Sequence, residues 1–344
     1  MKMHLKKLSE QTIVITGATS GIGLVTAREA ARQGARLVLA ARNEDALKTL
    51  CEELNAYPPA SERAIHVVAD VGDADQVRRI ADAAIARFGG FDTWVNNAGV
   101  SIFGRMEDVS MEDQRRLFET NFWGVVHGSM VAVEHLKQRG GSLINLGSEV
   151  SDRAVPLQGM YSASKHAVKG FTESLRSELE SQRAPVSVTL VKPAAIDTMF
   201  VAHAKNYMEV EPQLPPPIYA PESVAEAILH AAQHPMRDVF VGSGAKLVSA
   251  SSHYTPRLLD RVMARFMVGA QRTDRPSAPG RTDALHDAGV GLHERSGQSG
   301  GNARTSLYTR ASLHPRLTTV VALGAGAAGL GLASLLRKRR RSLA

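Results

Sequence analysis

The chain has 344 residues, of which 44% are hydrophobic and 22% charged, so it can form a globular domain with a full-sized core. Its net charge is +7, but five of the positive charges form the run 337–341, and the remainder carries only +2. This distribution excludes a basic nucleic-acid-binding domain. The single cysteine, Cys51, excludes an intramolecular disulfide and favours a reducing compartment.

Short apolar runs alternate with amphipathic stretches from residue 11 to about residue 242. The runs are rich in Val, Ile and Leu without strict alternation, which is typical of strands buried on both faces of a parallel sheet. The stretches between them are long enough for crossover helices, the first over 22–33 and ended by Gly34. The sequence therefore predicts an α/β fold, a doubly wound parallel sheet of Rossmann type. Its seven or so strands are expected at 12–15, 37–41, 64–69, 93–96, 142–146, 187–191 and 239–241.

A glycine-rich turn follows the first predicted strand and precedes the first helix, with the sequence TGATSGIG at 16–23. Glycines allow a tight turn and a close approach of the backbone to a pyrophosphate, which the helix N-terminus then stabilises. A glycine cluster alone is also compatible with a simple turn, but this placement favours a dinucleotide site. The residues assigned to it are Gly17, Thr19, Ser20, Gly21, Ile22 and Gly23.

The second predicted strand ends in Ala41 and Arg42. A site that prefers NAD places a carboxylate near this point to accept hydrogen bonds from the ribose 2′-hydroxyl. Arg42 instead offers a guanidinium to a 2′-phosphate. The sequence therefore favours NADP(H) as cofactor, with NAD(H) as the alternative, and a solvent-exposed arginine at a helix start as the other interpretation of Arg42.

Three motifs in this order and spacing resemble the classical short-chain dehydrogenase/reductase family: TGxxxGxG at 16–23, NNAG at 96–99 and YSASK at 161–165. The resemblance covers about residues 9–245. It implies hydride transfer between a nicotinamide cofactor and a carbonyl or alcohol. The TGxxxGxG spacing favours this branch over the epimerases and dehydratases of the extended branch.

Tyr161 and Lys165 are four residues apart, so they share one face of a helix. An unperturbed tyrosine, with a pKa of about 10, is a poor base at neutral pH, and a nearby ammonium is expected to lower this pKa. The resemblance implies that Tyr161 is the acid/base, that Ser148 holds the substrate oxygen and that Asn121 supports a proton relay. Lys165 is implied to bind the nicotinamide ribose as well. Taken singly, Ser148 is equally typical of a helix cap and Asn121 of a polar helix residue.

The resemblance also implies cofactor contacts after later strands, with an adenine contact after the third strand and a nicotinamide loop after the sixth. Ala194 stands in that loop where the family usually has glycine. No metal site is predicted, because the twelve histidines form no clustered ligand set. The further contacts are Asp70, Val71, Asn97, Ala98, Gly99, Pro193, Ile196 and Thr198.

An apolar region at 199–219 is expected to cover the substrate. A mobile apolar lid would suit a lipophilic substrate, and ordinary packing of a loop onto the core explains the same residues. His203 is expected on the surface.

The composition changes after residue 266. Residues 272–316 are polar and rich in Gly, Ser and Arg, which predicts a flexible linker. Residues 317–336 carry no charge and as a helix would be about 30 Å long, which matches a bilayer core. We expect a membrane anchor with a basic end over 317–341, the alternatives being a soluble helix, a disordered tail or an oligomerising helix.

Three parts are therefore expected: a catalytic domain over 9–271, a linker over 272–316 and the hydrophobic segment over 317–341. The predicted function is an NADP(H)-dependent oxidoreductase that acts on a lipophilic carbonyl or alcohol. We expect a homo-oligomer with a cytoplasmic catalytic domain, because no signal peptide is predicted, and with membrane association through the tail. The alternative is a membrane-tethered, non-catalytic NADP-binding sensor or scaffold.

Overall fold

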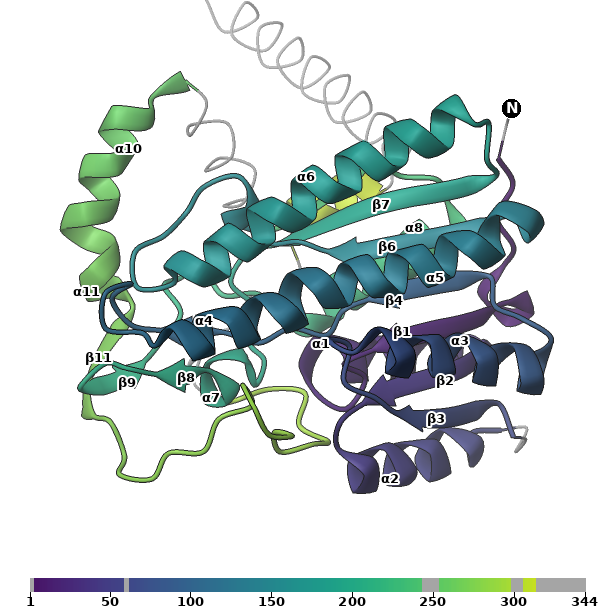
Figure 1. Ribbon diagram of the computed structural model, residues 1–344, viewed down its shortest axis with the longest axis horizontal. Helices are drawn as coiled ribbons and strands as arrows, with labels where there is room; N and C mark the ends of the chain where they lie inside the picture. The colour runs from purple at the N-terminus through teal and green to yellow at the C-terminus, as the bar shows by residue number, and fades with distance from the viewer. Residues whose placement is uncertain (1–2, 59–61, 243–253, 298–305, 314–344) are drawn as a thin grey trace, which may run out of the picture.

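The computed structural model describes residues 3–58, 62–242, 254–297 and 306–313. A seven-stranded parallel sheet lies at its centre, in the order β10-β7-β6-β4-β1-β2-β3 (Figure 1). The predicted doubly wound sheet is confirmed, and each predicted run falls on one strand. The order reverses between β1 and β4, where ligands of such sheets bind. The strands are β1 (Thr12–Thr16), β2 (Arg36–Ala41), β3 (Ala64–Val68), β4 (Thr93–Asn96), β6 (Gly141–Leu146), β7 (Val186–Pro193) and β10 (Asp238–Val241).

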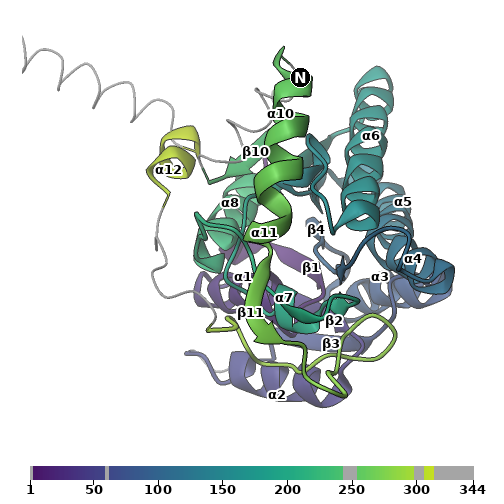
Figure 2. The ribbon, with the colours of Figure 1, turned by 90° about the vertical axis from the view of Figure 1, so that its left-hand side faces the viewer.

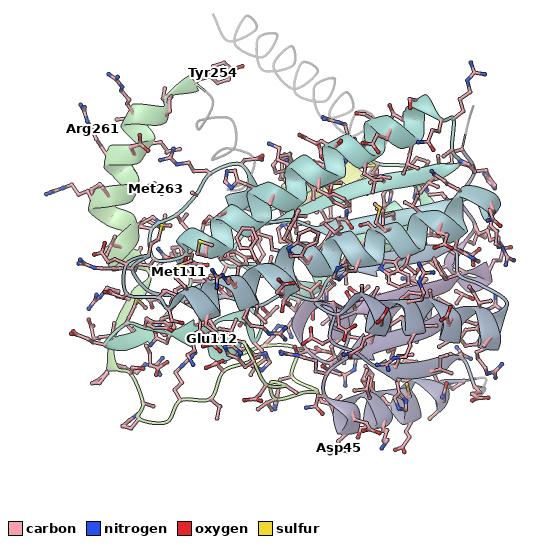
Figure 3. All side chains as sticks on the ribbon, in the orientation of Figure 1. Asp45, Met111, Glu112, Tyr254, Arg261 and Met263 are labelled. Carbon is pink, nitrogen blue, oxygen red and sulfur yellow. The ribbon has the colours of Figure 1, made fainter. Side chains whose placement is uncertain are left out.

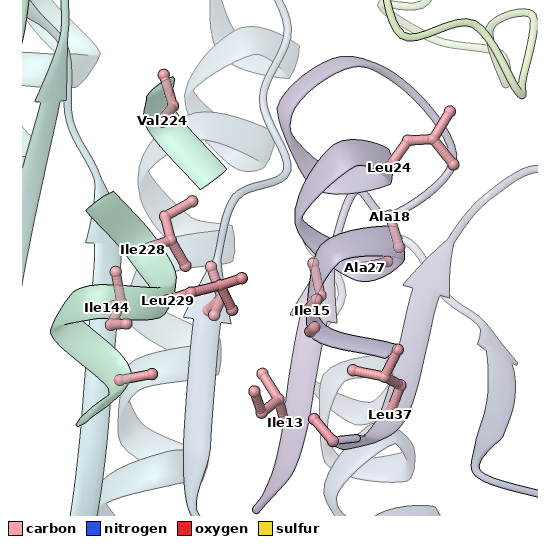
Figure 4. Packing of buried hydrophobic residues seen from close by; sticks show 14 of the residues in the cluster. Ile13, Ile15, Ala18, Leu24, Ala27, Leu37, Ile144, Val224, Ile228 and Leu229 are labelled. Carbon is pink, nitrogen blue, oxygen red and sulfur yellow. The ribbon is translucent and has the colours of Figure 1, made fainter. Parts of the chain in front are cut away.

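Helices cover both faces of the sheet, which explains the continuous apolar runs. In β1, Ile13 and Ile15 pack against one helical layer, whereas Val14 packs against the other. Figure 4 shows the first of these cores, where Leu24 of α1 and Ile228 of α8 meet the sheet. This layer contains α1 (Gly21–Arg32), α2 (Glu44–Asn55) and α8 (Pro221–Gln233), and the opposite layer contains α3 (Ala74–Phe88), α5 (Gly124–Arg139) and α6 (Gly159–Ser181).

Short elements complete the fold. The first of them, Leu8–Glu10, precedes β1, and most of the others lie around the carboxyl ends of the strands. Two small sheets form there, one by β5 with β8 and one by β9 with β11. These elements are η1 (Leu8–Glu10), β5 (Ile102–Phe103), α4 (Met111–Phe118), η2 (Glu119–Trp123), η3 (Glu149–Ser151), α7 (Phe200–His203), β8 (Lys205–Asn206), β9 (Val210–Pro212), α10 (Pro256–Val262), η4 (Met263–Met267), α11 (Val268–Ala270), β11 (Arg272–Pro276) and α12 (Leu307–Leu313).

The region predicted to cover the substrate contains α7, β8 and β9. Val201 and Met208 are buried there against Phe103 of β5. The pairing of β8 with β5 and of β9 with β11 holds the region at two further places. It therefore packs onto the core, as one of the two interpretations of its sequence expected.

Residues 272–297 follow a defined path along the side of the sheet where β11 and α10 lie (Figure 2). This path differs from the flexible linker that the composition predicts. The segment is held largely through its backbone: the side chain of Arg42 donates to the carbonyl oxygens of Ala284 and His286, at 2.5 and 3.0 Å. Composition indicates how many apolar side chains a segment can bury. It does not indicate whether the backbone carbonyl groups of the segment will accept hydrogen bonds from distant side chains.

No helix within the four described ranges is long and apolar enough to cross a membrane. The hydrophobic helix predicted over 317–336 and its basic end at 337–341 lie outside the described residues.

Candidate active site

One cavity of about 300 Å³ joins the glycine-rich turn to Tyr161 and Lys165 at the carboxyl ends of the strands. It brings together all the predicted catalytic and cofactor-binding residues except Gly23 and Asn121. The predicted residues that line it are Gly17, Thr19, Ser20, Gly21, Ile22, Arg42, Asp70, Val71, Asn97, Ala98, Gly99, Ser148, Tyr161, Lys165, Pro193, Ile196 and Thr198.

Gly23 lies behind the turn and lets it close. A Cβ at this position would come within 2.2 Å of the Gly17 carbonyl oxygen. The same turn is tied to the NNAG motif, because Asn97 Nδ2 donates to the carbonyl oxygens of Thr16 and Gly17 at 2.9 and 3.1 Å. Gly23 and Asn97 thus fix the shape of the turn, and Gly23 does so without lining the cavity.

The turn and the N-terminus of α1 fit a dinucleotide. Ser20 is the N-cap of α1 and its side chain makes no cap hydrogen bond. The Gly21 amide donates to the His293 carbonyl oxygen, so the amides of Ile22 and Gly23 are the first-turn donors that would face an anion. Gly17 has a φ of +64°, and a Cβ there would lie 2.8 Å from Ala98 Cα. A Cβ at Gly21 would lie 2.9 Å from Thr198 Cβ, so the loop predicted to hold the nicotinamide lies against the phosphate end.

Tyr161 projects from the first turns of α6 into the cavity. Its ring packs edge-on against Phe200 with centroids 5.1 Å apart, and Ser148 hydrogen-bonds its hydroxyl. Burial raises the pKa of Tyr161 to about 12; the bond to Ser148 acts in the opposite direction, and the charge of Glu149 adds to the increase. The expectation of a lowered pKa is therefore wrong for this state, because the removal of a phenolate from water is the largest effect on this pKa.

Lys165 is buried beside Tyr161, one helical turn along α6. Its Nζ donates to the Leu146 carbonyl oxygen at 2.8 Å and lies 5.8 Å from the centroid of the Tyr161 ring. Burial lowers the pKa of Lys165 to about 8. The pair thus consists of a protonated phenol and an ammonium group that burial makes more acidic, and the protonated phenol suits donation of a proton by the tyrosine.

Asn121 is fully buried in the π-helical turn η2 between α4 and α5. Both polar atoms of its side chain are hydrogen-bonded to Val100. Oδ1 accepts from the Val100 amide at 2.8 Å, and Nδ2 donates to the Val100 carbonyl oxygen at 2.9 Å. Nδ2 also lies 3.2 Å from Ser164 Oγ on α6. Asn121 therefore holds the loop after β4 against α6. A π-turn at a functional site is a common arrangement.

Glu149 follows Ser148 and also lines the cavity, a position that the sequence analysis missed. Burial raises the pKa of this carboxyl from 4.5 to about 7. The group was missed because a glutamate in a loop carries no sequence signal of burial.

This shift makes stability depend on pH through Glu149. Between about pH 4.5 and 7 the folded state keeps the proton that the unfolded state releases, so the stabilisation is complete below this window and is lost as the pH rises through 7. We expect Glu149→Gln to raise the melting temperature over wild type by a few degrees at about pH 8 and by little at pH 4.5. Thermal unfolding across this range measures the difference. The exposed Glu112→Gln (Figure 3) is the control, and a pH-independent difference for Glu149→Gln would contradict the assignment.

His203 lies in the site and Arg116 lies next to it, and the sequence indicated neither of them. His203 lines the cavity, is half-buried and has a pKa lowered by burial, so the expectation of a surface position is wrong. Arg116 of α4 pairs with Asp70 and also donates from Nε to the Leu285 carbonyl oxygen at 3.1 Å. Arg42 thus lines the adenosine end of the predicted cofactor site, and Arg116 lies behind Asp70.

The opposite end of the cavity is mainly apolar and lies beyond Tyr161. Hydrophobic side chains from the region at 199–219 and from η4 line it, together with the amides of Gln158 and Gln271, which hydrogen-bond at 2.6 Å. Its apolar lining includes Val150, Val155, Met199, Phe200, Leu214, Pro215 and Met267.

Comparison with known proteins gives similarities over most of the chain. The sequence pattern described as short chain dehydrogenase matches residues 11–208. Over 326 residues the chain is 51% identical to YxnA of Bacillus subtilis, an uncharacterized oxidoreductase, with 94% of this chain and 91% of that protein covered.

Two solved structures have a similar fold. A short chain dehydrogenase of Burkholderia cenocepacia in complex with NADP gives a TM-score of 0.62 at 25% identity, covering 75% of this chain and 99% of that one. An alcohol dehydrogenase of the archaeon Thermococcus sibiricus, complexed with 5-hydroxy-NADP, gives 0.59 at 29% identity, covering 67% and 95%. Both neighbours are thus complexes with NADP or a derivative of it.

Proposed function

Because the chain belongs to the short-chain dehydrogenase family, we propose that it is an NADP(H)-dependent reductase or dehydrogenase of a lipophilic carbonyl or alcohol, with Tyr161 as acid/base. It is an oxidoreductase that uses a nicotinamide dinucleotide and a small-molecule substrate. The observation that carries the proposal is the cavity that joins the glycine-rich turn to Ser148, Tyr161 and Lys165.

In the proposed reduction, Ser148 and Tyr161 hold the substrate oxygen by hydrogen bonds. When bound, NADPH supplies the hydride to the carbonyl carbon. Tyr161 donates its phenolic proton as negative charge develops on the oxygen, and burial keeps that proton in place at neutral pH until then. The Lys165 ammonium then favours the phenolate that remains. Oxidation of the alcohol runs through the same contacts in reverse.

NADP(H) is proposed over NAD(H) because of charge at the adenosine end. Arg42, which lines the cavity, would face a 2′-phosphate there, with the Arg116–Asp70 pair beside it, and both solved neighbours carry an NADP-type ligand. Asp70 and Val71 would contact the adenine, and Thr198 the carboxamide. The apolar end of the cavity, lined by Phe200 and Leu214 among others, supports a lipophilic substrate.

Oxidation of NADPH in the presence of a panel of lipophilic ketones and aldehydes tests the proposed activity. Turnover with at least one of them is expected. Binding of NADPH without turnover of any of them would instead favour the alternative, a membrane-tethered sensor or scaffold that binds NADP. The presence of Ser148, Tyr161 and Lys165 in one cavity favours the enzyme, since a pure binding protein has no use for all three.

Membrane association through 317–341 is proposed from the sequence, and the segment 254–267, which contains α10 and η4, offers independent support. Tyr254, Leu258 and Phe266 recur at intervals of four or eight residues and are 81%, 61% and 63% exposed. The exposed Arg261 lies beside them, while Met263 is buried toward the body of the molecule (Figure 3). An apolar stripe next to arginine is typical of helices that lie on anionic lipid surfaces.

Fractionation of the full chain against a version that stops at Arg316 tests the anchor. We expect the full chain in the membrane fraction and the shortened chain largely in the supernatant, while both oxidise NADPH at similar rates. Equal distribution of the two would contradict the anchor.

A homo-oligomer with a cytoplasmic catalytic domain is also proposed. Met111, Trp123 and Met130 are 61%, 45% and 44% exposed along the continuous run of α4, η2 and α5, which supports contact with a second copy. Light scattering of the purified chain measures the oligomeric state, and a monomer at micromolar concentration would contradict it.

A further inference from the structure

Residues 281–296, here called the C-terminal strap, cross the adenosine half of the cavity. Ala284, Ala288, Gly289 and Val290 line that cavity together with the glycine-rich turn and Arg42. Leu285 fixes the strap, because its side chain is fully buried among Val100, Val109 and Leu117. The strap is therefore a wall of the proposed cofactor site, although it follows the family-matched region by more than 70 residues.

Three consecutive carbonyl groups of the strap accept hydrogen bonds from Arg42. The Arg42 guanidinium donates to the carbonyl oxygens of Ala284, Leu285 and His286, at 2.5, 3.3 and 3.0 Å. The next side chain, Asn43, donates from Nδ2 to the Gly289 carbonyl oxygen at 3.1 Å. A guanidinium has five N–H donors, so Arg42 keeps donors for an anion while its orientation is fixed.

The strap also meets the glycine-rich turn itself. The Leu292 amide donates to the Thr19 carbonyl oxygen at 2.7 Å, and the Gly21 amide donates to the His293 carbonyl oxygen at 2.9 Å. At Gly291 the backbone packs so closely on α2 that a Cβ would come within 2.3 Å of Ala46 Cβ. The strap therefore touches the proposed phosphate-binding and ribose-binding residues in succession.

Side-chain contacts anchor the strap on both sides of the cavity. His286 Nε2 lies 2.7 Å from Asp113 Oδ1 on α4, and Glu294 pairs with Arg28 of α1 at 2.6 Å. Burial alone would raise the pKa of Asp113, but hydrogen bonds from His286 and Tyr207 lower it, so the carboxylate is charged where it meets the strap. Loss of either anchor would loosen the carbonyl groups that hold Arg42.

We propose that the C-terminal strap is a selectivity element of the cofactor site, which positions Arg42 for the 2′-phosphate of NADP(H). The inference rests on the proposed NADP(H)-binding function. Burial lowers the pKa of Arg42, which means that its charge is partly removed from water, and three neutral carbonyl groups compensate this without cancelling the charge. A fixed, partly desolvated guanidinium binds a phosphate more tightly than a mobile one, because less side-chain entropy is lost on binding. His286 and Glu294 are accordingly positioning residues.

The test measures the affinity of the full-length protein for NADPH and for NADH by fluorescence titration. For His286→Ala we expect the Kd for NADPH to rise about tenfold and the Kd for NADH by no more than about twofold, because only NADPH carries the 2′-phosphate. His286→Gln keeps a donor toward Asp113 and is expected to restore most of the affinity. Arg78→Gln, which breaks a surface ion pair of 3.0 Å with Glu134, is the matched control.

Equal losses for the two cofactors, or no loss for His286→Ala, would overturn the proposal. Glu294→Gln weakens the other anchor, the pair with Arg28, and is likewise expected to raise the Kd for NADPH more than the Kd for NADH. This second variant tests the proposal even if His286→Ala lowers the melting temperature. Limited digestion with trypsin provides a readout that does not depend on enzymatic activity. NADPH is expected to slow cleavage after Arg281 and Arg295 in the wild type, and an unchanged rate of cleavage would contradict a role of the strap in cofactor binding. Failure of the wild type to bind NADPH at all would overturn the proposed function instead.

Discussion

Replacing Tyr161 by Phe is expected to lower kcat by about 10²–10⁴-fold while the Kd for NADPH changes by less than about threefold. The substitution removes only the hydroxyl that donates the proton, and it keeps the ring that packs on Phe200 with centroids 5.1 Å apart. Steady-state oxidation of NADPH with an accepted carbonyl compound gives kcat, and fluorescence titration gives the Kd. Tyr57→Phe is the control, since its hydroxyl bonds Glu53 on α2 away from the cavity.

Two outcomes would contradict this role of Tyr161. Turnover at the wild-type rate would mean that another group supplies the proton. Equal loss of turnover and of cofactor binding would mean that Tyr161 maintains the structure of the site. Thermal unfolding of the variant separates the second outcome from a simple loss of the fold.

Replacing Arg42 by Ala is expected to raise the Kd for NADPH by about 10–100-fold and the Kd for NADH by only a few-fold. The range corresponds to the loss of hydrogen bonds to a charged group, about 1.5–3 kcal/mol. The effect on NADH is expected to be smaller because NADH has no 2′-phosphate. Some loss of NADH affinity is still expected, because Arg42 also holds the strap through the carbonyl groups of 284–286. Titration of both cofactors measures the ratio.

Arg32→Ala provides the matched control for Arg42, because Arg32 is an exposed arginine of α1 that contacts only Glu29 and the Tyr57 ring among the pairs described. It is expected to leave both Kd values unchanged. If Arg42→Ala weakened NADPH and NADH equally, Arg42 would serve the strap and not the 2′-phosphate.

The sheet, the glycine-rich turn and the Tyr161–Lys165 pair could be predicted because their signals are local. Seven apolar runs mark seven strands, and the parallel order brings their carboxyl ends to one edge. A spacing of four residues places Tyr161 and Lys165 on one face of α6 whatever surrounds them. These features follow from short stretches of sequence and the regular geometry of helices and strands.

The ionisation of the site could not be predicted in the same way. The sequence places an ammonium near Tyr161, and on that basis a lowered pKa was expected. Burial raises the pKa to about 12 instead, and it likewise raises the pKa of Glu149 to about 7. The desolvation of a group depends on every element packed around it, and no spacing along the chain encodes that sum.

The C-terminal strap is a second feature that only the tertiary structure determines. The composition of 272–316 predicts little burial and therefore a flexible linker. Arg42 and Ala284 are nevertheless hydrogen-bonded across 242 positions of sequence, and His203, expected on the surface, faces the same cavity.

The sequence by itself thus determined the sheet, the glycine-rich turn and the Tyr161–Lys165 pair, because each follows from the local geometry of a strand, a turn or a helix. Only the tertiary structure decided which backbone groups enclose the proposed cofactor site and which side chains lose water, because such contacts join segments with no sequence relation to one another.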